Sequence, residues 1–368
     1  MTRYRPTVVE VDLDAVRDNV RKLLPARAEL LAVVKADGYG HGDAAAARAA
    51  LEAGASWLGV ATVEEGLGLR DRGISAPILG LSEFPPGSEK EALAAGLTPS
   101  VYTAEGLVGA AEAAGAIGRR VDVHLKVDTG MHRVGVWPPA AAVAFARRIL
   151  EAGLVLQGLL THFADSEQDR EGTLEQLRRL LEVRDSLARE GIEPELMHAA
   201  NSAATIALPE THLDMVRPGA AVYGLDPGEG LGPAFALRPA LAWRSAVTMV
   251  KRLPAGERVS YGGRYTLDVD ATIATVAVGY EDGFWRALGG RAQVLIRGRR
   301  HPVVGTVTMD QVLVDCADAE VAPGDEVVLI GSQGDQRITA EELASHAGTI
   351  GREIVTGISE RVPREYIA

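Results

Sequence analysis

The chain has 368 residues, of which 47% are apolar, and a formal net charge of −12. This length predicts two domains, and the acidic balance argues against nucleic acid as a partner. Cys316 is the only cysteine, so an internal disulfide and a thiolate metal cluster are excluded. The first residues show no apolar signal segment, and no stretch is apolar for long enough to span a membrane. We therefore expect a cytoplasmic protein without a membrane partner.

Short apolar runs alternate with longer segments of helical period over residues 30–216, a pattern typical of βα units around a parallel sheet. The helical segments include residues 42–54, 138–153 and 172–191, and each ends near a glycine that suits a left-handed cap. Eight strands with helices between them predict an α/β fold, namely a (β/α)₈ TIM-type barrel over residues 1–232. The eight runs are LLAVVK, WLGV, PILGL, LTPSV, VDVHLKV, LVLQGLLT, ELMHA and HLDMV.

The composition changes at Pro233, where β-rich runs separated by Gly, Pro and Asp begin. Only ITAEELASHAG still has a helical pattern in this part of the chain. Residues 233–368 are therefore predicted to form a mostly β C-terminal domain. The early run VVEVDL precedes the first barrel unit, which makes residues 1–12 a candidate strand of that second domain.

Polar residues follow the apolar runs, at the strand ends where barrels of this type place their chemistry. Two lysines, an arginine and a histidine in one site suit an anionic ligand. Barrels commonly bind phosphate with the loops after strands seven and eight, and here those loops read AANSAATIAL and RPGAAVYGL. We therefore expect a phosphorylated ligand. The residues at the strand ends are Lys35, Lys126, Asp128, His162, Asn201, Ser202, Arg217 and Gly219.

Lys35 is the most informative of these residues. A desolvated lysine has a depressed pKa, which is what Schiff-base chemistry needs, whereas the alternative is a lysine whose ammonium reaches water at the barrel rim. His162 alone is equally consistent with a hydrogen-bonded structural histidine, and Ser202 alone with a helix N-cap. The hypothesis rests on their joint placement.

A series of motifs along the whole chain resembles the alanine racemase family. The run AVVKADGYGHG is similar to the cofactor-lysine signature of that family, and eight further motifs follow in the family's order. The resemblance implies an N-terminal barrel and a β domain in a head-to-tail homodimer whose active site is shared between subunits. It also implies pyridoxal 5′-phosphate (PLP) as cofactor, and interconversion of L-alanine and D-alanine that supplies D-alanine for cell-wall peptidoglycan. The further motifs are LKVDTGMHRVGV, THFADSE, NSAAT, RPGAAVYG, SYGGRY, VGYEDGF, TMDQ and RVPREY.

The resemblance assigns two catalytic bases. Lys35 would hold the cofactor and act on the D-face of the substrate, and Tyr261, from the second domain of the other subunit, would act on the L-face. Two opposed acid/base groups are what proton removal from one face and return to the other requires.

The resemblance also assigns residues to the cofactor and the substrate, and it implies no metal. It places Arg217 at the pyridine nitrogen with His162 contacting that arginine, and Lys126 as a possible carbamylated lysine that holds Arg133. The remaining positions are Tyr39, Ser202, Gly219 and Ala220 at the phosphate, Arg133, Met309 and Asp310 at the substrate, and Tyr280 at the entrance.

Three positions depart from the pattern of many family members. Thr308 stands where many have cysteine, and Ala220 where a bulkier aliphatic is common. Glu360 stands where several have a tyrosine that hydrogen-bonds the phosphate, and we expect it to turn away or pair with Arg361 or Arg364. These departures leave cofactor affinity and substrate size open.

Other functions remain as alternatives at this stage. One is a metal-dependent hydrolase that uses a carbamylated lysine with His124, His162 and His198 as metal ligands. Against it, no pair of histidines follows strand one, and strand eight ends in arginine rather than in an acidic ligand. Others are a non-catalytic PLP-binding protein and a racemase of serine or another small amino acid. For Tyr261, Tyr280 and Met309 the alternative is packing within the β domain.

Overall fold

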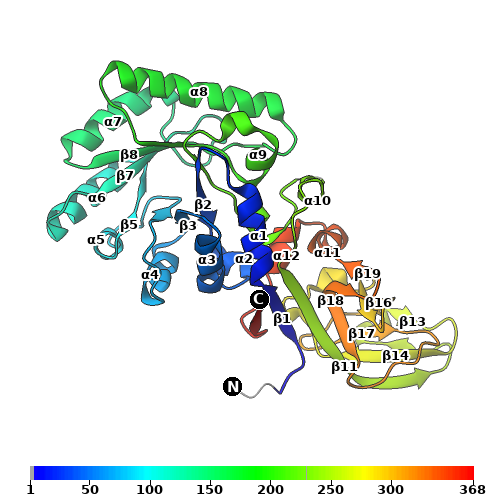
Figure 1. Cartoon of the computed structure of the whole chain (residues 1–368). Coiled ribbons are helices and arrows are strands. Elements are labelled where there is room, and N and C mark those ends of the chain that lie inside the picture. Colours follow the sequence, from blue (N-terminus) through cyan, green and yellow to red (C-terminus); the bar gives the residue numbers. More distant parts are fainter. Residues whose placement is uncertain (1–3, 229) are drawn as a thin grey trace. The chain divides into compact units, whose positions relative to one another are not determined.

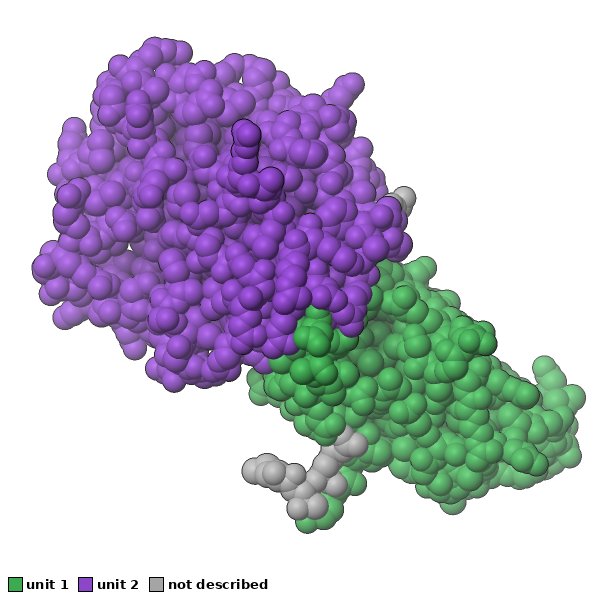
Figure 2. Space-filling view, viewed as in Figure 1, with its two compact units in different colours: residues 1–14, 239–368 green, residues 15–238 purple. Residues whose placement is uncertain are grey.

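The computed structural model describes residues 4–228 and 230–368, which form two compact units (Figures 1 and 2). One unit is Ala15–Arg238, and the other joins the segment up to Asp14 to Pro239–Ala368. The first unit thus ends at Arg238 rather than at the expected residue 232. At this end of the unit, the Asn19 side chain, on α1 (Leu13–Leu23), accepts the Arg238 backbone N–H and donates to the Arg238 carbonyl, both at 2.8 Å.

The first unit is built on a nearly closed parallel barrel (Figure 1), which confirms the predicted fold class. Its strand order is β5-β4-β3-β2-β10-β9-β8-β7-β6. The terminal strands β5 (Leu97–Thr98) and β6 (Ser100–Val101) are the two halves of the run LTPSV, divided at Pro99, which has no N–H for a ladder. The eight predicted runs therefore form the wall of the barrel, with β5 and β6 counted as one run. The others are β2 (Glu29–Val33), β3 (Trp57–Val60), β4 (Ile78–Gly80), β7 (Asp122–Lys126), β8 (Val155–Leu160), β9 (Leu196–His198) and β10 (Met215–Val216).

Helices connect the strands, and several begin or end at the residues that the sequence indicates. Thr62 and Glu65 form a reciprocal capping box at the start of α4 (Val63–Asp71). Gly153 and Gly191, with φ of +76° and +71°, follow α7 (Ala142–Glu151) and α8 (Arg170–Arg189). The others are α3 (Asp43–Glu52), α5 (Glu89–Ala94), α6 (Ala104–Ile117), α9 (Ser202–Ala207) and α10 (Leu231–Ala234).

The second unit is a sheet of order β19-β18-β15-β16-β17-β14-β11-β1-β20, in which β18 also pairs with β11 (Leu241–Leu253). The early strand β1 (Val8–Asp12) runs antiparallel to β11 and parallel to β20 (Arg364–Ile367). Trp243 on β11 is fully buried in the core of this unit. The other strands are β14 (Ala271–Val276), β15 (Gln293–Ile296), β16 (Arg299–Val304), β17 (Val312–Asp315), β18 (Glu326–Gln333) and β19 (Gln336–Ile338), with a separate hairpin of β12 (Arg258–Val259) and β13 (Tyr265–Thr266).

Two helices lie near the end of this unit, where the sequence indicates one. The predicted helix is α11 (Ala340–Ala347), capped by the Thr339 hydroxyl, and it is followed by α12 (Gly351–Thr356). The second helix was missed because six residues that begin with glycine are too short to show a helical period. No helix in the described parts of the chain is both long and apolar enough to cross a membrane.

Candidate active site

Lys35 follows β2 by two residues and opens a short turn of unusual hand. Residues 36–39 have φ values between +51° and +59° and ψ values between +39° and +53°, so the element α2 (Lys35–Gly40) contains a left-handed turn. Each L-residue in that conformation costs about 1–2 kcal/mol. The turn is fixed by three hydrogen bonds: the Val34 N–H donates to Gly59 O (2.9 Å), the Gly38 N–H to Val34 O (2.9 Å), and the Ala36 N–H to the Glu65 carboxylate (2.7 Å). The turn sets the directions in which Lys35 and Tyr39 leave the barrel.

Several basic groups lie close enough around Lys35 to shift one another's titration. Burial and the charge of Arg133 lower the pKa of Lys35. Burial, with Arg217 and Arg133, lowers the pKa of Lys126 to about 7, and its Nζ donates to Leu81 O at 2.8 Å. The pKa of His162 lies well below its ordinary value because of burial and the charge of Arg217. This excess of positive charge suits the anionic ligand that the strand ends predict.

A small cradle forms where the loops after β9 and β10 meet the turn of Tyr39. The Ser202 hydroxyl accepts the backbone N–H groups of Gly219 (2.9 Å) and Ala221 (3.2 Å). The Tyr39 ring stacks on buried Tyr223 with centroids 5.2 Å apart, and a Cβ on Gly219 would lie 2.9 Å from Tyr39 Cζ and closer still to its hydroxyl. The Ser202 and Tyr39 hydroxyls therefore both lie beside Gly219, next to the buried Ala220. This donor set fits a phosphate group.

Arg217 is buried at the end of β10 and is held by carbonyls and by a histidine. Its guanidinium donates to Thr161 O (2.6 Å) and Ala199 O (3.1 Å) and lies 2.8 Å from His198 Nδ1. Burial lowers the pKa of Arg217 to about 9, so it remains charged at neutral pH. The histidine that is hydrogen-bonded to Arg217 is His198, which ends β9, the strand next to β10. His162 follows β8 and is close enough for the charge of Arg217 to lower its pKa.

His124 extends this contact through the barrel, and sequence reasoning missed its role. His198 Nε2 lies 2.8 Å from His124 Nδ1, and His124 Nε2 lies 3.2 Å from Gln157 Oε1. His124 and His198, two of the metal ligands that the hydrolase alternative requires, therefore hydrogen-bond to each other, and His198 also bonds to Arg217. Among residues 4–228 and 230–368, no group of three or more His, Cys, Asp and Glu side chains is arranged to hold a metal ion. The signal for His198 was its place in a buried run, ELMHA, beside the run that precedes Arg217.

Tyr261 lies in the second unit, in a short 3₁₀ turn (Tyr261–Gly263), and 74% of it is exposed. The preceding residue, Ser260, has φ +65° and ψ −179°, a region used almost only by glycine. The Ser260 hydroxyl donates to Thr306 O (2.6 Å), and the Thr306 hydroxyl donates to Tyr261 O (2.9 Å). This reciprocal pair holds a strained backbone directly before the tyrosine.

Tyr280 and Met309 lie on two turns of the second unit that bond to each other. The N–H of Tyr280 donates to Thr308 O (3.0 Å), and that of Glu281 to Met309 O (3.1 Å). Tyr280 is 39% and Met309 50% exposed, so packing within the β unit does not account for these side chains or for Tyr261. Asp310 follows Met309 at the surface.

Glu360 is exposed. Its two neighbouring arginines bond to other groups. Arg361 pairs with the Asp310 carboxylate at 2.6 Å, and Arg364 donates to the carbonyl oxygens of residues 358, 359 and 362. The pairing that we expected for Glu360 is thus replaced by these contacts of Arg361 and Arg364.

Comparisons with known proteins agree over the whole chain. Residues 11–227 match the family model "Alanine racemase, N-terminal domain", and residues 240–366 match "Alanine racemase, C-terminal domain". An alanine racemase of Symbiobacterium thermophilum is 50% identical over 367 residues, covering 98% of this chain and 97% of the relative. The crystal structure of alanine racemase from D-cycloserine-producing Streptomyces lavendulae has a TM-score of 0.95 at 41% identity, covering 100% and 98% of the two chains. That of Bacillus anthracis with bound L-Ala-P has a TM-score of 0.94 at 39% identity, covering 100% and 96%.

Proposed function

The chain belongs to the alanine racemase family, and from that premise we propose that it interconverts L-alanine and D-alanine with PLP as its cofactor. The observation that supports this most directly is the convergence of Lys35, the cradle at Gly219 and the buried Arg217 at the strand ends of one barrel. We propose that the D-alanine supplies peptidoglycan synthesis and that the enzyme works in the cytoplasm, where free L-alanine is available.

The residues present fit the cofactor in three places. Lys35 would hold it covalently, because burial and Arg133 favour the neutral amine. The cradle of Tyr39, Ser202, Gly219 and Ala220 would receive the phosphate. Arg217, fixed by two carbonyls and His198, would donate to the pyridine nitrogen, and a guanidinium that keeps its proton leaves that nitrogen unprotonated.

The chain's own residues then divide the proton transfers. When bound, PLP supplies an electron sink that acidifies the α-proton of an amino acid. Lys35 accepts or returns that proton on the D-face, and Tyr261 does so on the L-face. The Tyr261 hydroxyl is aimed by the clamp of Ser260 and Thr306, which reduces the conformational freedom of the backbone beneath it.

A homodimer is part of the proposal. The exposed side chains of Tyr261, Tyr280 and Met309 are large and apolar or aromatic, which favours their being covered by a partner. In this arrangement each active site would combine Lys35 from the barrel of one subunit with Tyr261 from the β unit of the other. The same β unit would place Met309 and Asp310 toward the substrate carboxylate and Tyr280 at the entrance.

Borohydride reduction tests the cofactor assignment. The reduced adduct should map to Lys35 by mass spectrometry, whereas Lys126, whose pKa is also lowered by burial, serves as an internal comparison. An adduct on Lys126 or another lysine would contradict the assignment. Incubation with single L-amino acids, followed by enantiomer ratios, separates alanine from serine and other substrates. Absence of α-proton exchange in D₂O for every amino acid would favour the non-catalytic alternative.

We further propose that Lys126 is carbamylated and thereby holds Arg133. Its pKa of about 7 leaves a large neutral fraction at physiological pH, and only a neutral amine reacts with carbon dioxide. Protein equilibrated with ¹³C-bicarbonate should show a carbamate ¹³C signal that is missing from Lys126→Met. A signal that persists in this variant would assign the modification to another residue.

A further inference from the structure

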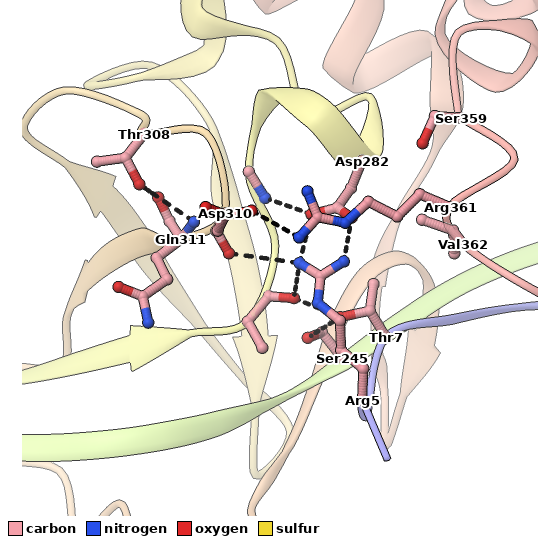
Figure 3. Close-up of polar contacts among 12 residues, drawn as sticks. Arg5, Thr7, Ser245, Asp282, Thr308, Asp310, Gln311, Ser359, Arg361 and Val362 are labelled. Carbon is pink, nitrogen blue, oxygen red and sulfur yellow. Dashed lines mark hydrogen bonds and ion pairs between the residues drawn. The ribbon is translucent and has the colours of Figure 1, made fainter. Parts of the chain in front are cut away.

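A buried carboxylate, that of Asp282, ends the turn that begins at Tyr280, and Figure 3 shows its polar contacts. The Asp282 side chain is fully buried. Its carboxylate accepts hydrogen bonds from both terminal nitrogens of Arg5, one of them at 2.6 Å, and from the backbone N–H of Gly279 at 2.8 Å. The Nε of Arg361 lies 3.6 Å away. A charge taken out of water is costly unless it is paired and hydrogen-bonded, and Asp282 has both kinds of partner.

The two arginines extend from Asp282 to the second turn. Arg5 also donates to Ala277 O (3.0 Å) and to Asp310 O (3.4 Å), and Arg361 donates to the Asp310 carboxylate (2.6 Å). Figure 3 shows both guanidinium groups between the two aspartates. Asp282 thus links four segments that are distant in sequence: the N-terminal segment, the turn of residues 279–283, the turn of residues 308–311 and the segment before β20.

The two turns also touch each other through their backbones. A Cβ on Gly279 would overlap the carbonyl groups of Met309 and Thr308, so the backbones are in direct contact there. The Thr308 hydroxyl closes the second turn by donating to Gln311 O at 2.8 Å. Asp282 caps the first turn and Asp310 belongs to the second, so the ion pairs of Arg361 with these two aspartates join the same two turns.

We propose that Asp282 is a positioning residue for substrate binding: it holds the turns of Tyr280 and Met309 in one fixed arrangement through Arg5 and Arg361. The inference rests on the proposed function, which gives Tyr280 and Met309 their places at the entrance and the substrate carboxylate. Asp282 itself, being fully buried, does not touch substrate or cofactor. Its charge matters because its loss leaves two guanidinium groups without their shared partner.

The test compares Asp282→Asn with the control Asp325→Asn. Asp325 is also a capping carboxylate of the β unit: it accepts the Ala322 N–H at 2.8 Å and pairs with Arg297 at 2.8 Å, and neither partner belongs to the two turns. In Asp282→Asn, hydrogen–deuterium exchange of the peptide covering residues 278–285 should accelerate about tenfold or more, as expected for a lost charged hydrogen bond. The KM for alanine should rise more than kcat falls, while the yield of reduced cofactor adduct stays unchanged.

The control and the exchange data decide between the outcomes. Unchanged exchange and KM in folded Asp282→Asn, or an equal rise of KM in Asp325→Asn, would overturn the inference. If Asp282→Asn does not fold, Arg361→Gln, whose side chain is 38% exposed, interrupts the same network from the surface and should show the same two effects at smaller size. Because exchange needs no substrate, a wild-type protein without racemase activity would refute the proposed function while the exchange data still decide whether Asp282 couples the two turns.

Discussion

Gly219→Ala tests whether the cradle is as tight as the structure indicates. The added Cβ would lie 2.9 Å from Tyr39 Cζ and closer to the hydroxyl, a separation that real Cβ atoms do not tolerate. Tyr39 has little room to retreat, because its ring stacks on Tyr223, which is fully buried.

Overpacking of this kind costs about 1–3 kcal/mol. If Tyr39 moves to relieve it, the loss falls on the phosphate contacts, and cofactor affinity should weaken about fivefold to 150-fold. The measurement is a titration of the apoprotein with PLP, followed by absorbance. Urea unfolding of the apoprotein should show whether part of the cost remains as strain.

Gly115→Ala is the matched control. Gly115 lies within α6, and a Cβ there would meet nothing within 4 Å. Alanine should therefore stabilise the chain by about 0.5–1 kcal/mol through helix propensity and leave PLP affinity unchanged. The reasoning about the cradle is refuted if Gly219→Ala binds PLP as tightly as the wild type and unfolds at the same urea concentration.

Four other outcomes are expected. Tyr261→Phe should keep the cofactor but lose about 10²–10⁴-fold in turnover, and mixing it with Lys35→Ala subunits should restore activity; near wild-type turnover of the variant in both directions would contradict the two-base scheme. Ser260→Gly removes backbone strain of about 1–3 kcal/mol and a hydrogen bond of about 0.5–1.5 kcal/mol, so urea unfolding should show equal or greater stability while kcat falls; an unchanged kcat would show that the clamp does not aim the tyrosine. Burial lowers the pKa of His124 from 6.5 to about 4, so its contribution to the free energy of unfolding is complete above pH 6.5 and decreases as the pH falls toward 4, by about 2 kcal/mol between pH 7 and 5. Urea unfolding of His124→Gln should therefore depend less steeply on pH than that of the wild type, and an equal pH dependence would refute this assignment. Glu360→Tyr should tighten PLP binding about ten- to a hundredfold by adding a phosphate donor, and unchanged affinity would mean that another group already occupies that position.

The barrel was predictable because its strands lie in short, mainly apolar runs, as burial on both faces requires. Strand order then follows from the chain order, so the neighbours β9 and β10, and with them the contact of His198 and Arg217, were within reach of the sequence. The motif that matched the family pointed instead to His162. A motif gives the residue type and the order along the chain, but the contact depends on which strands are adjacent.

Features fixed by tertiary contacts were not predictable. Ala36 and Tyr39 have no intrinsic preference for a left-handed turn, and its hydrogen-bond partners Gly59 and Glu65 come from β3 and α4. The pairing of Arg5 with Asp282 joins residues 277 positions apart, and no periodic pattern in the sequence indicates an ion pair over that separation. The hydrogen bonds between Asn19 and Arg238 likewise join residues 219 positions apart.

The left-handed turn after Lys35 has a consequence for the chirality of the chain itself. Its backbone is close to the mirror image of an ordinary helical turn, so three of its four positions hold L-residues where D-residues would be relaxed. At about 1–2 kcal/mol for each L-residue, the folded chain maintains roughly 3–6 kcal/mol of conformational energy next to Lys35. A semisynthetic chain with D-alanine at position 36 would release part of it, and would contain at its own active site the enantiomer that the proposed reaction makes.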